Sequence, residues 1–414
     1  MPSSAGCNLS IVCCSSVSHI RILLIGLFGA YMGFAMLSPL LAPLVRTLGL
    51  TEVQAGLLQS VSAFAWFLAG PFWGRRSDLV GRKPIFVSGL IGLGLGLGIF
   101  TLVAQAGLSG LLAGGALFAL LFVGRIIAGA LFSGSPAAAQ AYIADVTTPD
   151  QRTRAMASLG AATGMGFVIG PAVSAALANL GLIVPLAAAA LLPLIGGLIV
   201  AWRLPNPQTA AQREQPPRLS PFDARIRQFL LVGLIANVVL VMAQITGGFL
   251  VADRLALPPQ QVAQTIGVAL VISGLTVVAV QLGIVRRIKL PPVMLLRIGL
   301  LASLLSYVML LNANSFPMFV LAFVLLAIGI GFNEPGFTSA MTLAVNATEY
   351  GAVSGLTASV VGLSSMIGPL LGTGLYQVNQ SFPYLLGIVT LGLMLGVVWF
   401  SPGLRRSVAV AKAG

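Results

Sequence analysis

Three charged side chains stand well inside long apolar segments of the sequence: Arg125, Arg297 and Glu334. A charge at the centre of a membrane-spanning helix costs roughly 2.5 to 3.5 kcal/mol, so such residues usually serve a function. Glu334 follows Asn333 and precedes Pro335, which frees a carbonyl group and kinks a helix. Because apolar surroundings favour the neutral form of a carboxylate, Glu334 is the candidate for taking up and releasing a proton. Binding a cation, or a hydrogen bond between helices, is its alternative use.

The remaining acidic residues fall in predicted loops or at predicted helix ends, which leaves Glu334 as the only deep carboxylate: Glu52, Asp78, Asp145, Asp150, Glu214, Asp223, Asp253 and Glu349. Arg125 opens the segment RIIAGALFSGSP, and its guanidinium either acts inside the protein or extends along the helix to the surface. Arg297 lies near the start of its segment, where extension to the nearer face is the simpler interpretation.

A second group of charges lies in the segment GPFWGRRSDLVGRKP, between two long apolar runs. Its spacing is G-x-x-x-D-x-x-G-R-K, so Asp78 and Arg82 are one helical turn apart and can pair. Glycines at these positions allow a tight turn and close helix approach, and basic side chains can anchor at anionic headgroups. A patch that only sets the topology is the alternative. The motif positions are Gly74, Asp78, Gly81, Arg82 and Lys83.

The elements that position these residues are membrane helices. The chain of 414 residues is 57% hydrophobic with a mean hydropathy of +1.01 and only nine acidic residues, which excludes an ordinary soluble surface. A span needs about 20 apolar residues. The sequence predicts an all-α, polytopic membrane protein with twelve transmembrane helices, at roughly 21–44, 55–73, 85–105, 116–143, 155–177, 181–201, 228–250, 262–285, 293–312, 316–341, 353–376 and 382–401.

The basic residues predict the orientation. Of the 22 lysines and arginines, only Arg46 and Arg254 fall in the loops on one side, while the tails and the other loops hold nearly all the rest. By the positive-inside rule both termini are cytoplasmic. The net charge of +13 therefore reflects topology and attraction to the lipid bilayer, and no nucleic-acid partner is predicted.

The chain divides into two similar parts. Residues 203–227 are rich in Pro, Gln and Arg and predict a cytoplasmic linker. GFVIGPAVSAAL in the fifth span matches SSMIGPLLGTGL in the eleventh, which indicates two six-helix pseudo-repeat bundles. Parallel repeats of this kind are typical of alternating-access transporters; chance matching of Gly and Pro is the alternative. The predicted parts are an amino tail (1–20), a first bundle (21–202), the linker (203–227), a second bundle (228–401) and a carboxyl tail (402–414).

With these motifs the chain resembles the major facilitator superfamily, and in particular its twelve-span drug:proton antiporters such as the tetracycline exporters. The signature loop of that family lies between spans two and three. The resemblance implies that Asp78 and Arg82 belong to a charge cluster that holds the bundles together on the cytoplasmic side, and that Asp145 joins it. It implies proton transfer for Arg125, because R-x-x-x-G is the second motif of the family. It implies an exporter-type helix motif for Gly166, Gly170 and Pro171; generic helix packing is the alternative.

One departure limits the resemblance. Many antiporters of this type carry an acidic residue in the first span, whereas the segment 23–44 has none. Proton coupling in this chain must therefore use another site, which returns the prediction to Glu334. Candidates for the substrate cavity are polar, aromatic or sulfur-containing side chains inside spans: Tyr31, Met36, Gln140, Tyr142, Asn237, Gln244, Asn333 and Phe337.

Other chemistry is not predicted. His19 is the single histidine, so a histidine-based metal site is excluded, and no phosphate-binding loop for ATP is present. We expect the protein not to be an enzyme and to need no cofactor. We expect a monomeric secondary transporter of the inner membrane that exports small organic molecules, drugs or siderophore-like metabolites, by proton antiport. An importer or facilitator of the same fold, and a membrane sensor that does not transport, are the alternatives.

Overall fold

The computed structural model describes residues 6–206, 219–288, 290–346 and 349–400. The predicted carboxyl tail (402–414) lies outside the described residues, as do residues 1–5 of the amino tail and residues 207–218 of the predicted linker.

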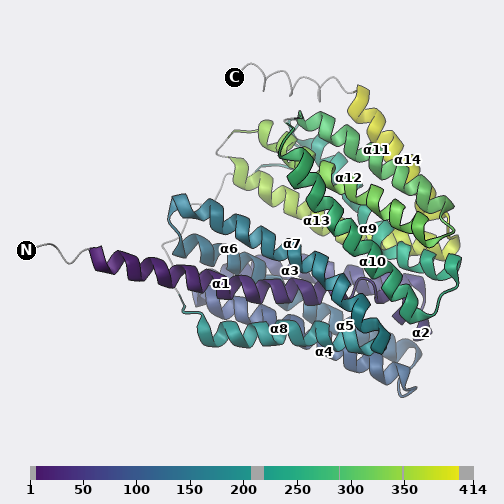
Figure 1. The fold of residues 1–414 in the computed structure, drawn as a ribbon, viewed down its shortest axis with the longest axis horizontal. Coiled ribbons are helices and arrows are strands. Elements are labelled where there is room, and N and C mark those ends of the chain that lie inside the picture. Colours follow the sequence, from purple (N-terminus) through teal and green to yellow (C-terminus); the bar gives the residue numbers. More distant parts are fainter. Residues whose placement is uncertain (1–5, 207–218, 289, 347–348, 401–414) are drawn as a thin grey trace, which may run out of the picture. The chain divides into compact units, whose positions relative to one another are not determined.

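The described residues form helices and no strand, and twelve stretches are long and apolar enough to cross a membrane. This confirms the predicted all-helical, twelve-span fold. In chain order the helices are α1 (Gly6–Met36), α2 (Leu41–Thr47), α3 (Glu52–Val80), α4 (Arg82–Leu108), α5 (Gly114–Phe132), α6 (Gly134–Val146), α7 (Pro149–Leu177), α8 (Ile183–Arg203), α9 (Arg227–Leu255), α10 (Pro259–Ala279), α11 (Pro292–Asn312), α12 (Phe316–Leu343), α13 (Tyr350–Val378) and α14 (Phe382–Phe400) (Figure 1).

Prolines interrupt two of the predicted spans. The first span ends at Met36, because a turn containing Pro39 separates α1 from α2. The expected end at residue 44 was therefore wrong. The fourth span is divided between α5 and α6 at Ser133, since Pro136 lacks the N–H that would reach the carbonyl group of Phe132.

Contacts divide the chain into two compact units. Unit 1 comprises Met1–Leu37 and Phe64–Arg213, and unit 2 comprises Ser38–Ala63 and Glu214–Gly414. In unit 1, α1 packs against α7 and α8, and α4 packs against α5, α6 and α8 (Figure 1). In unit 2, α9 packs against α13 and α14, and α11 packs against α12 and α14. The helix pairs of unit 1 thus recur in unit 2 between helices of the same rank, as an internal duplication requires. The bundle boundaries proposed from the sequence stay predictions.

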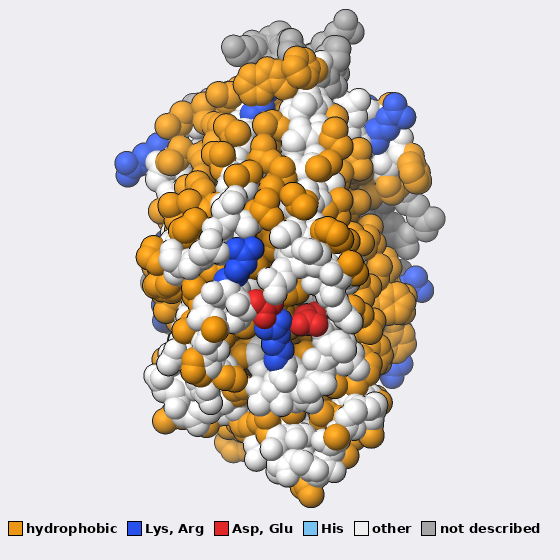
Figure 2. Space-filling view, turned by 90° about the vertical axis from the view of Figure 1, so that its right-hand side faces the viewer, with side chains coloured by type: hydrophobic (Ala, Val, Ile, Leu, Met, Phe, Trp, Pro, Cys, Tyr) orange, Lys and Arg blue, Asp and Glu red, His pale blue; other side chains and the backbone are white. Residues whose placement is uncertain are grey.

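The surface suits a lipid environment. Large apolar side chains stand exposed along the spans, among them Phe67, Leu102 and Leu198. Figure 2 shows apolar side chains over much of one face, with only a few charged ones among them. Because a bilayer core holds no water to bond exposed backbone groups, each span must satisfy its own N–H and C=O groups, and an α-helix does so within one segment.

Candidate functional site

The loop motif builds a charge cluster within unit 1. Gly81 separates α3 from α4 with a φ of 107°, a conformation that favours glycine. Arg82, the first residue of α4, donates to Asp78 and to Ser77 Oγ (3.2 Å) at the end of α3. The predicted pair therefore forms, but across the break at Gly81 and not along one continuous helix.

The two carboxylates of this cluster have different surroundings. Arg82 Nε donates to Asp145 Oδ2 at 3.1 Å, so the end of α6 is tied to the start of α4. The side chain of Asp145 is 3% exposed and that of Arg82 is 11% exposed, whereas Asp78 is 64% exposed. Asp145 is thus the buried carboxylate partner of Arg82, and its role in a conformational cluster stays a prediction. Hydrogen bonds of a buried carboxylate are stronger than those of an exposed one.

The other motif positions are placed as follows. Lys83 is half-buried. Within 4 Å of the position that a Cβ would take on Gly74, the described part of the chain places no atom. Glycine at this position is therefore not explained by packing inside unit 1.

The fifth-span motif brings α7 against α1. A Cβ on Gly166 would stand 2.8 Å from the Cβ of Tyr31, and one on Gly170 would stand 2.6 Å from the carbonyl oxygen of Met32. Ser174 Oγ donates to the carbonyl oxygen of Met36 at 2.8 Å. These glycines therefore permit a close helix contact, and the residue after them, Pro171, lies inside α7. Unit 2 repeats the contact, since a Cβ on Gly368 would stand 2.9 Å from the carbonyl oxygen of Val238.

Arg125 lies in the interior of unit 1. Its side chain on α5 is 1% exposed, so the guanidinium does not extend to the surface. Arg297, in contrast, is only partly buried. Its guanidinium lies 4.7 Å from the ring centroid of Trp399 and donates to the carbonyl oxygens of Val398 and Trp399, both at 3.4 Å. Of these two deep arginines, Arg125 is the one whose charge is held inside a helix bundle.

Glu334 meets a predicted cavity residue. Its Oε1 accepts a hydrogen bond of 3.1 Å from Asn237 Nδ2, which joins α12 to α9 in unit 2. Asn237 also donates to the carbonyl oxygen of Gly233 at 3.0 Å, which fixes the direction of its amide. Pro335 lies inside α12, and Thr338 donates to the carbonyl oxygen of Glu334. Among the described residues no lysine or arginine forms an ion pair with Glu334.

This arrangement can hold Glu334 in either protonation state. The amide N–H of Asn237 can donate to a carboxylate or to the carbonyl oxygen of a neutral carboxyl group. With no paired lysine or arginine among the described residues, the charged form of Glu334 gains little electrostatic support. The carboxyl group of Glu334 is therefore suited to exchange its proton for a positively charged or hydrogen-bond-donating partner.

The remaining cavity candidates are mostly packing residues. The ring of Tyr31 packs edge-on against Phe132 and is tilted against Phe167, with centroid distances of 5.5 and 5.2 Å, respectively. Asn333 Nδ2 donates to Ser303 Oγ at 3.5 Å, which joins α12 to α11. The others are Met36, which is buried; Tyr142, which donates to the carbonyl oxygen of Pro205 at 3.2 Å; Phe337, which packs on Gly233; Gln244, which is half-buried; and Gln140, which is exposed.

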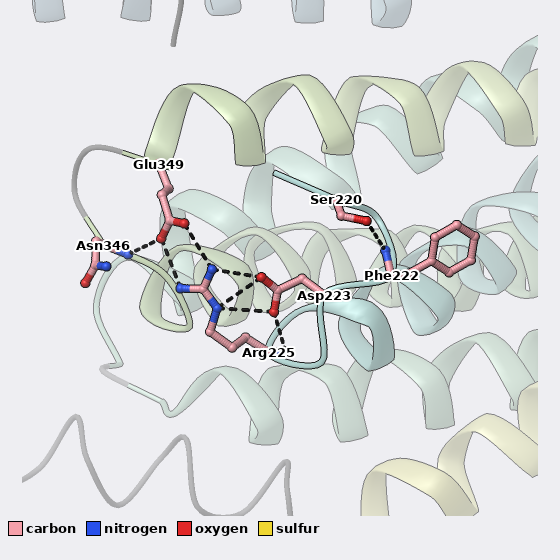
Figure 3. Close-up of polar contacts among 6 residues, drawn as sticks. All are labelled: Ser220, Phe222, Asp223, Arg225, Asn346 and Glu349. Carbon is pink, nitrogen blue, oxygen red and sulfur yellow. Dashed lines mark hydrogen bonds and ion pairs between the residues drawn. The ribbon is translucent and has the colours of Figure 1, made fainter. Parts of the chain in front are cut away.

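Sequence reasoning missed a cluster around Arg225 (Figure 3). Arg225 donates to Asp223 at 2.8 Å and to both oxygens of Glu349 at 3.0 and 3.1 Å. The guanidinium lowers the pKa of Asp223 and that of Glu349 below their usual values. The contact ties the end of the linker to the start of α13. The D-x-R spacing was visible in the sequence, but the partner 124 residues away was not.

Comparison with known proteins identifies the family. The model of the Major Facilitator Superfamily matches residues 23–360. The chain belongs to this superfamily. It is 23% identical over 391 residues to Multidrug resistance protein 1 of Bacillus subtilis, covering 92% of this chain and 96% of that protein. It is 28% identical over 380 residues to the class G tetracycline resistance protein of Vibrio anguillarum, covering 87% and 91%.

A solved structure agrees with the assignment. The human organic anion transporter MFSD10 superposes with a TM-score of 0.64 at 20% identity, covering 92% of this chain and 99% of that one. At this identity the likeness supports the fold alone. Members of the Major Facilitator Superfamily are transporters and not enzymes, so the chain is a multi-pass membrane transporter of small molecules.

Proposed function

We propose that this Major Facilitator Superfamily protein exports small organic molecules across the cytoplasmic membrane in exchange for protons, with both termini in the cytoplasm. The observation that carries the proposal is the Glu334–Asn237 pair, a carboxylate inside a span with a neutral hydrogen-bond donor. The names of the relatives, which refer to multidrug and tetracycline resistance, support efflux. Alternating access would present Glu334 to one side of the membrane and then to the other.

In this mechanism the substrate and the proton compete for one carboxylate. The charged form of Glu334 attracts a cationic or hydrogen-bond-donating substrate from the cytoplasm. A proton arriving from outside neutralises the carboxylate, and the substrate loses that attraction and leaves. Asn237 keeps the side chain in place in both states, because its amide N–H donates to either form. Release of the proton to the cytoplasm restores the charge.

Flux through purified protein in proteoliposomes tests the proposal. Tetracycline, ethidium and an iron-free siderophore are offered as probes, with and without an imposed pH gradient. We expect at least one probe to move against its concentration gradient when protons flow the other way. Movement that only dissipates a probe gradient, at a rate independent of pH, would instead indicate a facilitator, and probe and protons moving together would indicate an importer.

A further inference from the structure

An early segment of the chain is held inside unit 2 by a second charge cluster. Residues 38–63 belong to unit 2, although the chain on both sides of them belongs to unit 1. At their centre Arg46, on α2, donates to Glu52 Oε1 at 3.0 Å and to both oxygens of Asp253, with 2.9 Å to Oδ2. The guanidinium also lies 5.2 Å from the ring centroid of Phe249.

Asp253, at the end of α9, is the acceptor that joins this segment to the rest of unit 2. Its Oδ2 also accepts from the hydroxyl group of Tyr376 at 2.6 Å and from Gln380 Nε2 at 3.1 Å. One carboxylate therefore gathers α2, the end of α13 and the loop after it. We call Arg46, Glu52, Asp253, Tyr376 and Gln380 the Arg46 cluster.

The helix that follows the cluster packs closely on α13. A Cβ on Gly56 would stand 2.1 Å from Thr373 Oγ1 and 2.8 Å from the carbonyl oxygen of Pro369, so only glycine permits this approach. One turn further, Ser60 Oγ donates to the carbonyl oxygen of Met366 at 2.7 Å, and Ser60 is 3% exposed. The first part of α3 thus packs within unit 2, while the residues of α3 beyond 63 belong to unit 1.

Given alternating access, which this inference takes from the proposed function, the repeats must separate at each end of the molecule in turn. We propose that the Arg46 cluster is a latch that holds residues 38–63 within unit 2 and opens once in each transport cycle, at the opposite end of α3 from the Arg82 cluster. Opening breaks the contacts of Arg46 with Asp253 and frees the surfaces around Gly56 and Ser60. Closing restores them.

The cluster is built so that opening leaves no charge without a partner. Glu52 lies in the same segment as Arg46 and leaves with it. Tyr376 and Gln380 lie in unit 2 and stay with Asp253. Because an unpaired charge at a partly buried site is costly, this division keeps the two states close in free energy. It also means that Glu52 competes with Asp253 for the same guanidinium.

The two carboxylates on Arg46 therefore have opposite effects on the latch. Asp253→Asn removes the bond that exists only in the closed state, so it favours opening, by about tenfold if one hydrogen bond to a charged group is lost. Glu52→Gln removes the competing carboxylate, so it favours the closed state, by about threefold for a partly buried pair whose side chains are 31% and 22% exposed. Arg46→Lys keeps the charge but loses the two-pronged contact, and we expect a smaller shift towards opening.

Thiol labelling measures the latch directly. Ser60→Cys is introduced into full-length protein in which Cys7, Cys13 and Cys14 are replaced by serine, and an impermeant maleimide is added to intact cells. Leu111→Cys, in the exposed loop after α4, serves as the fully accessible control. The reagent is applied to the face of the membrane from which Leu111→Cys is labelled, so the test does not depend on the predicted orientation.

We expect Ser60→Cys to react more slowly than Leu111→Cys. Adding Asp253→Asn should make Ser60→Cys react about tenfold faster, and adding Glu52→Gln should make it react more slowly than it does alone. Equal rates in the two variants, or shifts in the same direction, would overturn the latch. If Asp253→Asn does not reach the membrane, Arg46→Lys decides, and an unchanged labelling rate in it overturns the proposal. Labelling needs neither substrate nor gradient. If the variants show these shifts while wild-type protein moves no probe, the result contradicts the proposed function and not the latch.

Discussion

The two carboxylates of the Arg82 cluster should contribute very different amounts to the free energy of unfolding. Asp145 is 3% exposed and accepts from a guanidinium that is 11% exposed, so Asp145→Asn loses a buried hydrogen bond to a charged group, worth about 2 kcal/mol. Asp78 is 64% exposed and pairs with Arg82 four residues away, a contact worth about 0.4 kcal/mol. We therefore expect Asp145→Asn to cost several times more unfolding free energy than Asp78→Asn.

Thermal unfolding of the purified protein in detergent measures this difference. The assay compares both single variants, the double variant and Arg82→Gln, and a double-mutant cycle isolates the energy that Asp145 and Arg82 share. A loss in Asp78→Asn equal to that in Asp145→Asn would refute the reasoning from burial.

The effect of Asp78→Asn on transport should be much larger than its effect on stability. We expect Asp78→Asn to slow transport strongly while it leaves the protein in the membrane, because the proposed cytoplasmic clamp loses a charge that biases the conformational equilibrium. Such a loss with little change in stability would place the function of Asp78 in a conformation other than this one. Normal flux in Asp78→Asn would exclude the clamp.

Three further predictions concern topology, packing and pH. Ser220→Cys, near the end of the linker, should be protected from an impermeant thiol reagent in intact cells that labels Leu111→Cys; the reverse pattern would invert the proposed orientation. Gly170→Ala should destabilise the protein, because its Cβ would stand 2.6 Å from the carbonyl oxygen of Met32, whereas Gly164→Ala, which has open space, should not; equal unfolding temperatures would contradict the close contact. Arg225 lowers the pKa of Asp223 and of Glu349, so this cluster should stabilise the protein at a pH above the usual pKa values of these carboxyl groups. The stabilisation should be lost as the pH falls through their lowered pKa values. The unfolding temperatures of wild type and Arg225→Gln should therefore differ at pH 7 and converge in acid.

The spans were predictable because hydropathy is a local property. Each membrane helix needs a run of apolar residues in continuous sequence, and each run can be read without knowing what it packs against. The breaks after Met36 and at Ser133 were harder to predict, because proline is also tolerated inside membrane helices, as Pro71 and Pro335 show here.

The polar contacts were predictable only where they were short in sequence. Asp78 and Arg82 lie four residues apart, and a helical repeat predicts their pairing. Arg46 and Asp253 lie 207 residues apart, and Asn237 and Glu334 lie 97 apart. No periodicity relates such positions, so one sequence can identify the charged residue but not its partner.

In the proposed mechanism Glu334 carries the coupled proton, and transport by Glu334→Gln in proteoliposomes tests this role. Glutamine keeps the shape and can still accept from Asn237, but it cannot exchange a proton. Glu349→Gln, which removes a carboxylate at the start of α13, is the control. We expect Glu334→Gln to lose transport driven by a pH gradient while it still exchanges probe for probe, and Glu349→Gln to keep gradient-driven transport. Gradient-driven accumulation that survives in Glu334→Gln would show that Glu334 does not carry the coupled proton.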